Sequence, residues 1–103
     1  MRIISRKTLI NYWTEHSDTE QPLKSWYDEV SNALWSSPNE LKKHYRNSSI
    51  ISKKRVVFNI HGNKYRLVVD IEYSIGIVFI VWIGTHKEYD KISVKEIKYV
   101  KAD

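Results

Sequence analysis

The chain has no cysteine among its 103 residues, which excludes a disulfide, a thiol nucleophile and a zinc site built on cysteine. Long hydrophobic segments are missing too, because the longest apolar run, from Ile75 to Ile83, is about half as long as a membrane-spanning helix. The first six residues, MRIISR, become polar too soon for a signal peptide. We therefore expect a cytoplasmic protein that does not enter a membrane.

Internal repeats, low-complexity tracts and linkers are absent from the sequence as well. A chain of 103 residues can build one modest hydrophobic core but not two, and its 42% of apolar residues argues against disorder. The sequence therefore predicts a single domain over residues 1–103.

Positive charge is what the sequence has in excess. The formal net charge of +5 and the isoelectric point near 9.4 favour a polyanionic partner, although many small cytoplasmic proteins are mildly basic without binding one. The cations cluster at Lys42–Arg46, at Lys53–Arg55 and at Lys64 with Arg66, and aromatic residues lie among them. This pattern is typical of a surface that binds phosphates and stacks bases.

The first half of the chain has the spacing of helices. The clearest apolar stripe begins at Leu23 and recurs 3, 4, 7, 10 and 11 residues further on, and Pro22 places the start of this helix near Thr19. The segments expected in this half are a short strand at residues 2–5, helices at residues 7–16 and from about 19 to 36, a helical turn at residues 40–45 and a loop at residues 47–52.

Three strands are expected in the second half, at Arg55 to Ile60, Tyr65 to Tyr73 and Ile77 to Thr85. The last strand is apolar almost throughout, as in a central strand that is buried on both faces. Together with the helices these strands predict an α+β fold. The C-terminal stretch, Ser93 to Lys101, fits either a helix or an edge strand.

The first hairpin suggests a register for the sheet. Glycine and asparagine at positions 62 and 63 suit the positive φ values of a tight turn. A two-residue turn there places Asn59 opposite Arg66. In the same register Arg55 lies opposite Asp70.

The second hairpin extends this register to the last strand. A three-residue turn at positions 74–76 places Tyr73 opposite Ile77, and therefore Arg66 opposite Gly84. Arg66 then projects from the sheet with no side chain on Gly84 to crowd it. The opposite face packs on the helices and collects Val56, Phe58, Ile60, Tyr65, Leu67, Val69, Ile71, Ile77, Phe79, Val81 and Ile83.

Two carboxylates, Asp70 and Glu72, share the face of Arg66 as metal ligands would. No third ligand is placed to join them, and a surface salt bridge between Asp70 and Arg55 is the better interpretation. Nucleotide-binding and His-Glu-x-x-His signatures are also missing. We therefore predict no metal and no cofactor.

Several segments of the sequence together resemble a known family. Arg55–Ile60, Gly62–Val68 and Gly84–Lys91 carry the most specific motifs, and Met1–Ser5 and Trp26–Trp35 fit as well. In these segments the chain resembles the HigB branch of the RelE-like toxins, which are mRNA interferases of bacterial type II toxin–antitoxin systems.

The resemblance implies N-terminal helices packed on one face of a small, mainly antiparallel twisted sheet, with an RNA groove on the other face. It also implies ribosome-dependent cleavage of translated mRNA in the bacterial cytoplasm. The implied partners are mRNA on the ribosome and a cognate helix-turn-helix antitoxin similar to HigA. Because the catalytic set varies within the RelE-like group, the activity carries over more safely than individual residue roles.

Cleavage of RNA without a metal uses the neighbouring 2′-hydroxyl as nucleophile, so the protein supplies proton transfer and positive charge. His86 suits the proton transfer, because an imidazole ordinarily titrates near neutral pH. Arg66 suits the phosphate, because its planar guanidinium can hold two oxygens at once. Tyr89 either stacks a base or takes part in a hydrogen bond with the reacting groups. These three residues are the catalytic candidates.

Further residues of the strands and turns carry a positive charge or an amide that can bind the RNA backbone or read a base edge. The RNA-binding candidates are Lys53, Lys54, Arg55, Asn59, Asn63, Lys64 and Lys87.

Each candidate has a structural alternative. His86 could serve as a surface or capping residue, Arg66 could pair with an acidic residue of its own sheet, and Tyr89 could pack on the last segment. Residues 53–55 could be a solvated loop. Trp82 either floors the groove or packs beneath the C-terminal segment.

Two other classes of function suit the same composition. A non-catalytic module that binds RNA or the ribosome would use the same basic face, and it would keep RNA binding when His86 or Arg66 is lost. A purely protein-binding subunit would show no salt-dependent RNA affinity.

Overall fold

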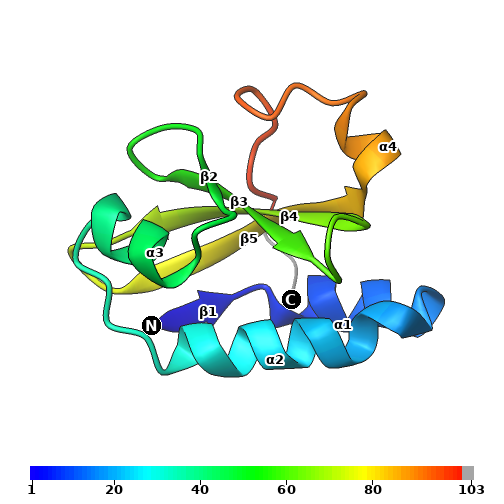
Figure 1. Cartoon of the computed structure of the whole chain (residues 1–103), viewed down its shortest axis with the longest axis horizontal. Coiled ribbons are helices and arrows are strands. Elements are labelled where there is room, and N and C mark those ends of the chain that lie inside the picture. Colours follow the sequence, from blue (N-terminus) through cyan, green and yellow to red (C-terminus); the bar gives the residue numbers. More distant parts are fainter. Residues whose placement is uncertain (101–103) are drawn as a thin grey trace.

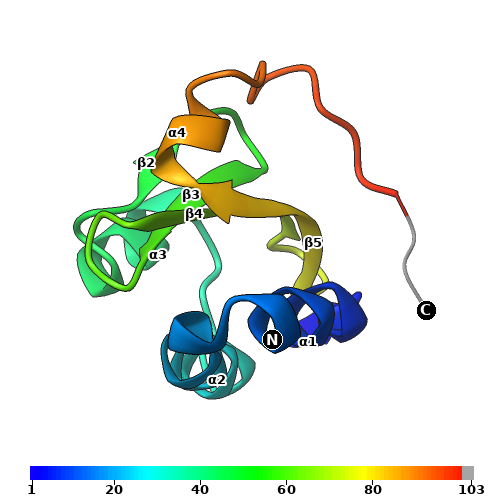
Figure 2. The same cartoon turned by 90° about the vertical axis from the view of Figure 1, so that its right-hand side faces the viewer.

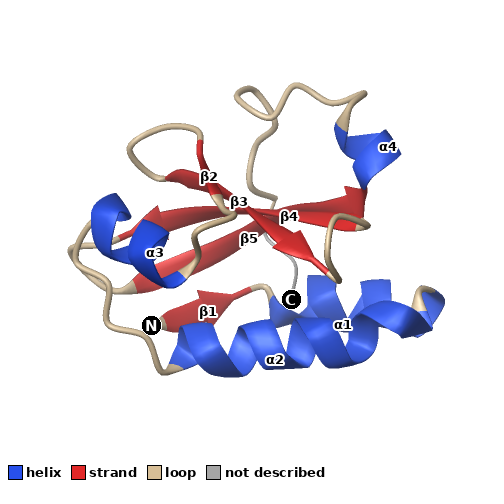
Figure 3. Cartoon of the chain, viewed as in Figure 1, coloured by secondary structure: helices blue, strands red, loops and turns tan. Residues whose placement is uncertain are grey.

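The computed structural model describes residues 1–100 of the chain. The elements follow in the order β1 (Arg2–Ile4), α1 (Arg6–Glu15), the 3₁₀ turn η1 (Ser17–Thr19), α2 (Glu20–Ser31), α3 (Pro38–His44), β2 (Ser49–Ile50), β3 (Arg55–Ile60), β4 (Tyr65–Glu72), β5 (Ile77–Thr85) and α4 (His86–Tyr89) (Figure 1). Helices and strands both occur, as the sequence predicts, and the α+β fold class is confirmed (Figure 3).

The five strands form one sheet in the order β1-β5-β4-β3-β2. β1 runs parallel to β5 and the other neighbours are antiparallel, so the sheet is mainly antiparallel. The helices α1 and α2 lie on one side of it, while α4 and the chain after it lie on the other side (Figure 2). We call the face away from α1 and α2 the open face. No helix within residues 1–100 is long and apolar enough to cross a membrane.

The core lies between the sheet and the two long helices. The stripe of α2 buries Leu23, Trp26 and Val30, and the Trp26 ring meets Phe58 of β3 edge-on with centroids 5.4 Å apart. Burying aromatic rings and aliphatic side chains in this way removes large apolar areas from water, which is the main force that holds the layers together. Trp35 is also buried against Phe58 and belongs to the same core.

Two connecting segments differ from the sequence-based expectation. Residues 47–52 were expected to form a loop, but they include the short strand β2, which pairs with Val56 and Val57. A strand of two residues leaves no alternating pattern to detect. Residues 93–100 form neither a helix nor a strand, and Lys101 lies outside the described residues.

The first hairpin has the predicted register, with Asn59 opposite Arg66 and Arg55 opposite Asp70. Gly62 has a positive φ of 66°, as expected for this turn. The other positive φ, 55°, belongs to His61 and not to the asparagine at position 63.

The second hairpin has the predicted pairing at its far end, but its turn differs from the expected one. Glu72, and not Tyr73, pairs with Ile77, so the turn is one residue longer than expected. A bulge on β5 between Ile80 and Trp82 takes up this extra residue, and Arg66 therefore still lies opposite Gly84.

The bulge reverses the facing of the first half of β5. Val78 and Ile80 are 0% and 1% exposed and belong to the core, whereas the sequence placed Ile77 and Phe79 there. Phe79 pairs with Asp70 and lies on the open face. That part of the predicted core was wrong, because strict alternation cannot reveal a bulge.

Candidate active site

The candidate site is built on one row of residues across the open face. Gly84 of β5, Arg66 of β4 and Asn59 of β3 are successive partners in the sheet. Directly paired residues have Cβ atoms about 5 Å apart. The row therefore places a guanidinium beside an amide on one side and beside a glycine on the other.

His86 lies at the end of this row because β5 runs straight into α4. Thr85 caps α4 with a reciprocal pair of hydrogen bonds, since its Oγ1 accepts from the Glu88 amide and the Glu88 carboxylate accepts from the Thr85 amide. The backbone amide of His86 donates to the carbonyl of Lys64 at 3.0 Å. These contacts fix the histidine to the turn that joins β3 and β4.

The predicted catalytic pair shares one hollow. Arg66 and His86 line a surface depression of about 660 Å³ together with Asn63, Lys64, Thr85 and Lys87. All of these residues except Thr85 are site candidates predicted from the sequence. Arg66 and Lys87 have no carboxylate partner within residues 1–100, and Lys64, which pairs with Asp18, adds a third cation. Like charges repel unless an anion lies between them, so the hollow is suited to a phosphate.

The Arg66 guanidinium has no carboxylate partner within residues 1–100. Its Nη1 donates to the backbone carbonyls of Asn63 and Tyr65 at 3.0 and 3.2 Å. The acidic residues that the sequence offered as alternative partners are engaged elsewhere, Asp70 with Arg55 and Glu72 with Lys54. These two hydrogen bonds orient the Arg66 guanidinium, and its positive charge remains free to interact with an anion.

The His86 imidazole is about half exposed, and its Nδ1 lies 3.5 Å from a carboxylate oxygen of Asp90. An acidic neighbour at this distance can orient the ring. Sequence reasoning gave Asp90 no role, although its position four residues after His86 on a helical turn is the signal that could have suggested one.

Tyr89 ends α4 beside the hollow without lining it. Its ring lies 6.2 Å from that of Trp82. Burial raises the pKa of Tyr89, and the positive charge of Arg66 acts in the opposite direction. The phenol is therefore within electrostatic reach of the guanidinium.

The Trp82 indole fills the space beside Gly84 that was expected to be open in the predicted register. A Cβ atom at position 84 would lie 2.4 Å from the Cη2 atom of the indole, which no real contact allows. The glycine therefore makes room for the tryptophan, and not directly for Arg66. Trp82 and the ring of Tyr89 together form an aromatic wall next to the cations.

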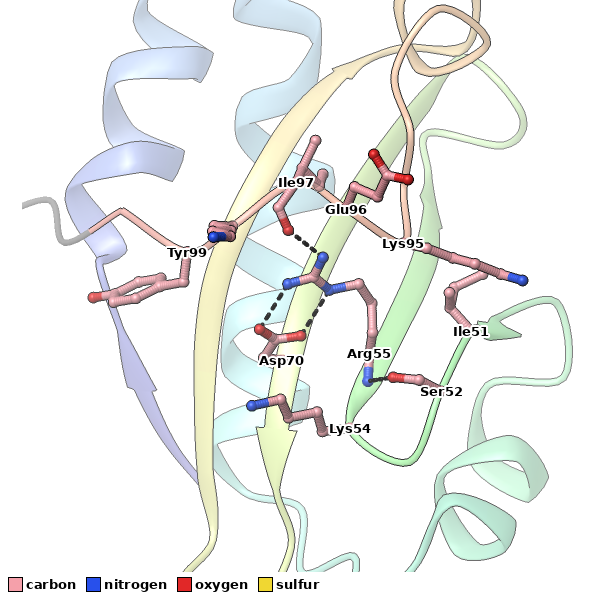
Figure 4. A pocket seen from close by; sticks show the side chains of 10 residues that line it. Ile51, Ser52, Lys54, Arg55, Asp70, Lys95, Glu96, Ile97 and Tyr99 are labelled. Carbon is pink, nitrogen blue, oxygen red and sulfur yellow. Dashed lines mark hydrogen bonds and ion pairs between the residues drawn. The ribbon is translucent and has the colours of Figure 1, made fainter.

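Arg55 lies in very different surroundings at the other end of β3. It is only 8% exposed, and its Nε and Nη2 atoms donate to the two carboxylate oxygens of Asp70, each at 2.8 Å. Its Nη1 donates to the carbonyl of Val94 at 3.1 Å, and also to that of Ile97, as Figure 4 shows. The predicted salt bridge is confirmed, but it is buried and not a surface pair.

The C-terminal segment, residues 93–100, covers this end of the open face. Beyond the carbonyls that Arg55 holds, the Tyr99 hydroxyl lies 2.7 Å from Ser5 Oγ, and the Tyr99 ring packs edge-on against Phe79. A cavity of about 940 Å³ is lined by residues of this segment and by residues between positions 51 and 70, with Lys54 and Lys95 among them (Figure 4). The sequence did not reveal that Arg55 holds this cover, because the groups it binds are backbone carbonyls.

The remaining RNA-binding candidates are spread over the molecule. Lys53 and Lys54 precede Arg55, so they lie at the covered end of β3, far along the strand from Asn59. Lys64 lies at the hollow but also pairs with Asp18 of η1 at 2.7 Å. Hydrogen bonding to Lys64 and to the Tyr65 hydroxyl lowers the pKa of Asp18, and the sequence did not reveal this partner.

Within residues 1–100 no group of three or more histidine, aspartate and glutamate side chains is arranged to hold a metal ion. Asp70 is fully engaged by Arg55, and Glu72 lies 3.8 Å from Lys54.

The fold and the site define a small basic α+β protein that presents a cationic hollow beside a histidine. A family model described as HigB_toxin, the RelE-like toxic component of a toxin–antitoxin system, matches residues 19–92. The chain therefore belongs to the HigB family of RelE-like toxins, as the sequence resemblance indicated. No curated protein matches the chain. The matched residues contain every catalytic and RNA-binding candidate, and family membership implies an antitoxin as partner.

Proposed function

We propose that the chain is an endoribonuclease that cuts translated mRNA on the ribosome and thereby stops translation and growth. The observation that carries this proposal is the joint hollow of Arg66 and His86, with Lys64 and Lys87 beside them. A phosphate group fits this set of cations, and the imidazole next to it supplies the proton transfer that the cleavage of RNA requires.

The proposed reaction needs no nucleophile from the protein. The 2′-oxygen of one nucleotide loses its proton and bonds to the adjacent phosphorus, while the bond from phosphorus to the 5′-oxygen of the next nucleotide breaks. That leaving oxygen takes up a proton. The products are a 2′,3′-cyclic phosphate and a 5′-hydroxyl end, so the protons balance without an external reactant.

Arg66 is proposed to stabilise the phosphate during this step. Negative charge builds up on its oxygens in the transition state, and a guanidinium held beside them by Asn63 and Tyr65 is already oriented. His86 is proposed to exchange a proton with one of the two reacting oxygens, and Asp90 to orient its ring. Tyr89 is proposed to bind the reacting nucleotide by stacking or by a hydrogen bond.

Asn59, Asn63, Lys64 and Lys87 are proposed to bind RNA next to the reacting phosphate, and Lys53 and Lys54 to bind it further along the open face. Arg55 is left out of this set. Each of its three guanidinium nitrogens donates to Asp70 or to a C-terminal carbonyl, so an RNA phosphate would have to displace a buried ion pair.

The dependence on the ribosome and a helix-turn-helix antitoxin that neutralises the toxin are proposed from the family alone. A location in the bacterial cytoplasm follows from the same proposal, because translated mRNA is found there.

The test is inducible expression without an antitoxin, with primer extension on cellular mRNA. Growth arrest and cuts within translated frames are expected for the wild type, and both should be lost in His86→Ala. A second arm uses an mRNA with a single 2′-deoxy nucleotide at a mapped cut, which should block that cut alone. Intact mRNA in the presence of soluble wild-type protein would overturn the catalytic proposal and favour a binding module.

A further inference from the structure

A second hollow lies beside the candidate active site, at the free edge of β3. β2 pairs only with Val56 and Val57, so residues 58–60 of β3 have no strand partner on that side. The chain between α3 and β2 borders this edge and leaves a depression of about 470 Å³, lined mainly by polar residues that include His44, Arg46 and Asn59.

This second hollow adjoins the first. Asn63 lines both depressions, and Asn59 is the direct partner of Arg66 across the sheet. The row Gly84, Arg66, Asn59 therefore leads from the hollow of His86 straight into the second one. A nucleotide strand whose phosphate lies on Arg66 would have its next nucleotide over the two asparagines.

The two asparagines offer the groups that a base edge needs. Asn59 Nδ2 is 3.3 Å from the carbonyl of Asn47 and 3.5 Å from Asn63 Oδ1, and both contacts are at the long end of hydrogen bonding. No other hydrogen bond to these two amides is formed within residues 1–100. Each amide carries both donors and an acceptor, so the pair can bond to a base in the plane of its ring.

A stacking surface and a cation complete the second hollow. The His44 ring is exposed and lies 4.7 Å from the ring of Tyr45, which is packed against Phe58 and so keeps the pair rigid. Arg46 is exposed and forms no ion pair in the part of the chain that the structure describes, and it also borders a shallow depression with Lys42 and Lys43. Aromatic rings next to free cations are the usual elements of a site for single-stranded RNA.

We infer that the hollow of His44, Arg46, Asn59 and Asn63 is a nucleotide subsite for the RNA residue that flanks the scissile phosphate. The base stacks on His44 and bonds to the asparagine amides, and the following phosphate lies on Arg46. The inference rests on the proposed ribonuclease function. It adds that the RNA strand crosses the sheet at the end that carries Arg66 and Asn59.

The first test is a binding measurement that needs no cleavage. A fluorescent single-stranded RNA with 2′-O-methyl groups lacks the free 2′-hydroxyl and stays intact, and its affinity is followed by anisotropy over a range of salt concentrations. Arg46→Gln should weaken binding and reduce the slope of log affinity against log salt by about 0.7, the value for one lost phosphate contact. The matched control is Arg2→Gln, an exposed arginine on the opposite edge strand β1, which should leave the slope unchanged.

The second test locates the base. Abasic residues are placed one at a time along the same RNA, and one position should cost the wild type about fivefold or more in affinity, as expected for one stacked base. His44→Ala and Asn59→Ala should abolish the sensitivity at that position only. Thermal melting of each variant checks that it is folded.

The outcomes separate this inference from the ribonuclease proposal. Equal slopes for Arg46→Gln and Arg2→Gln, or the same abasic profile in the wild type and both variants, would overturn the subsite even if the wild type cuts mRNA. Absence of mRNA cleavage together with a confirmed abasic profile would overturn the ribonuclease proposal and leave an RNA-binding site.

Discussion

Two arginines on the open face of the same sheet have opposite surroundings. Arg55 lies across from Asp70 and under the C-terminal segment, and four of its hydrogen bonds go to that carboxylate and to two carbonyls. Arg66 lies between Asn59 and Gly84 and keeps its charge uncompensated beside a hollow. The residue opposite each arginine in the sheet therefore decides whether it stabilises the fold or is free to bind a ligand.

The energetic consequences of the two arrangements also differ. A buried ion pair gains little over an apolar pair of the same shape, but the loss of one partner leaves a buried charge and is costly. An exposed cation contributes little to folding, and its full charge remains for a phosphate. Substitutions at the covered end should therefore change stability, and substitutions at the open end should change activity.

The largest expected effect is on stability, in Asp70→Asn. This change leaves Arg55 charged and buried, and the free energy of unfolding should fall by about 3–5 kcal/mol in urea denaturation. The matched control is Glu72→Gln on the same strand. The Glu72 side chain is 44% exposed and its pair with Lys54 is long, at 3.8 Å, so the change should cost at most about 1 kcal/mol. Equal losses in the two variants would show that Asp70 is not part of a buried pair.

The next effect is on activity, in His86→Ala. Loss of a proton-transfer group should lower the rate of mRNA cleavage by about 10²- to 10⁴-fold. The free energy of unfolding should change by no more than about 0.5 kcal/mol, because the side chain is half exposed. His61→Ala, at an exposed histidine in the turn between β3 and β4, provides the control and should cleave like the wild type.

Gly84→Ala should affect both stability and the rate of mRNA cleavage. Its Cβ would clash with the indole of Trp82, and overpacking of this kind costs about 1–3 kcal/mol. The displaced indole should also disturb the ring of Tyr89 and slow cleavage. Adding Trp82→Leu removes the clash, so stability should return in the double variant. Failure of that rescue in urea denaturation would mean that the indole is not what the added methyl group meets.

Thr85→Ala should have a smaller effect. It removes the side-chain oxygen that caps α4, and the loss of such a cap costs about 1 kcal/mol. Because α4 holds both His86 and Tyr89, cleavage should slow more than this loss of stability alone explains. Thr85→Ser retains the hydroxyl and should behave like the wild type in both assays. Equal effects of the two substitutions would contradict the role of the cap.

The smallest expected effect depends on pH. Hydrogen bonds from Lys64 and Tyr65 lower the pKa of Asp18, so the contribution of this carboxylate to stability is complete above its unfolded pKa of 3.8 and disappears as the pH falls through its lower folded value. Asp18→Asn should therefore lower the free energy of unfolding slightly at pH 7 and by less at pH 2. Urea titrations at both pH values measure this difference, and a loss that does not change with pH would contradict it.

The open end of the sheet was largely predictable from the sequence. The turn at positions 62 and 63 is short and carries its own signature, so Asn59, Arg66, Arg55 and Asp70 could be paired correctly. The family motifs then indicated the same histidine and arginine. Local turn chemistry and alternation are sufficient where a hairpin is regular.

The covered end was not predictable to the same degree. The longer turn and the bulge near Val81 each shift the register by one residue, and they cancel at Gly84 but not at Phe79. Arg55 holds the C-terminal segment through the backbone carbonyls of Val94 and Ile97. Every residue has such a carbonyl, so the sequence carries no signal for these contacts. Burial of Arg55 depends on that segment, so its residue type alone suggested a surface cation.

The most direct test of this comparison exchanges each arginine for glutamine and measures two quantities. One is the single-turnover rate of mRNA cleavage in reconstituted translation, and the other is the free energy of unfolding. Arg66→Gln should lose about 10²-fold or more in rate with stability unchanged within about 0.5 kcal/mol. Arg55→Gln should lose about 3 kcal/mol or more in stability and keep most of its rate wherever it is folded. A wild-type rate in Arg66→Gln, or a lost rate with full stability in Arg55→Gln, would contradict the account.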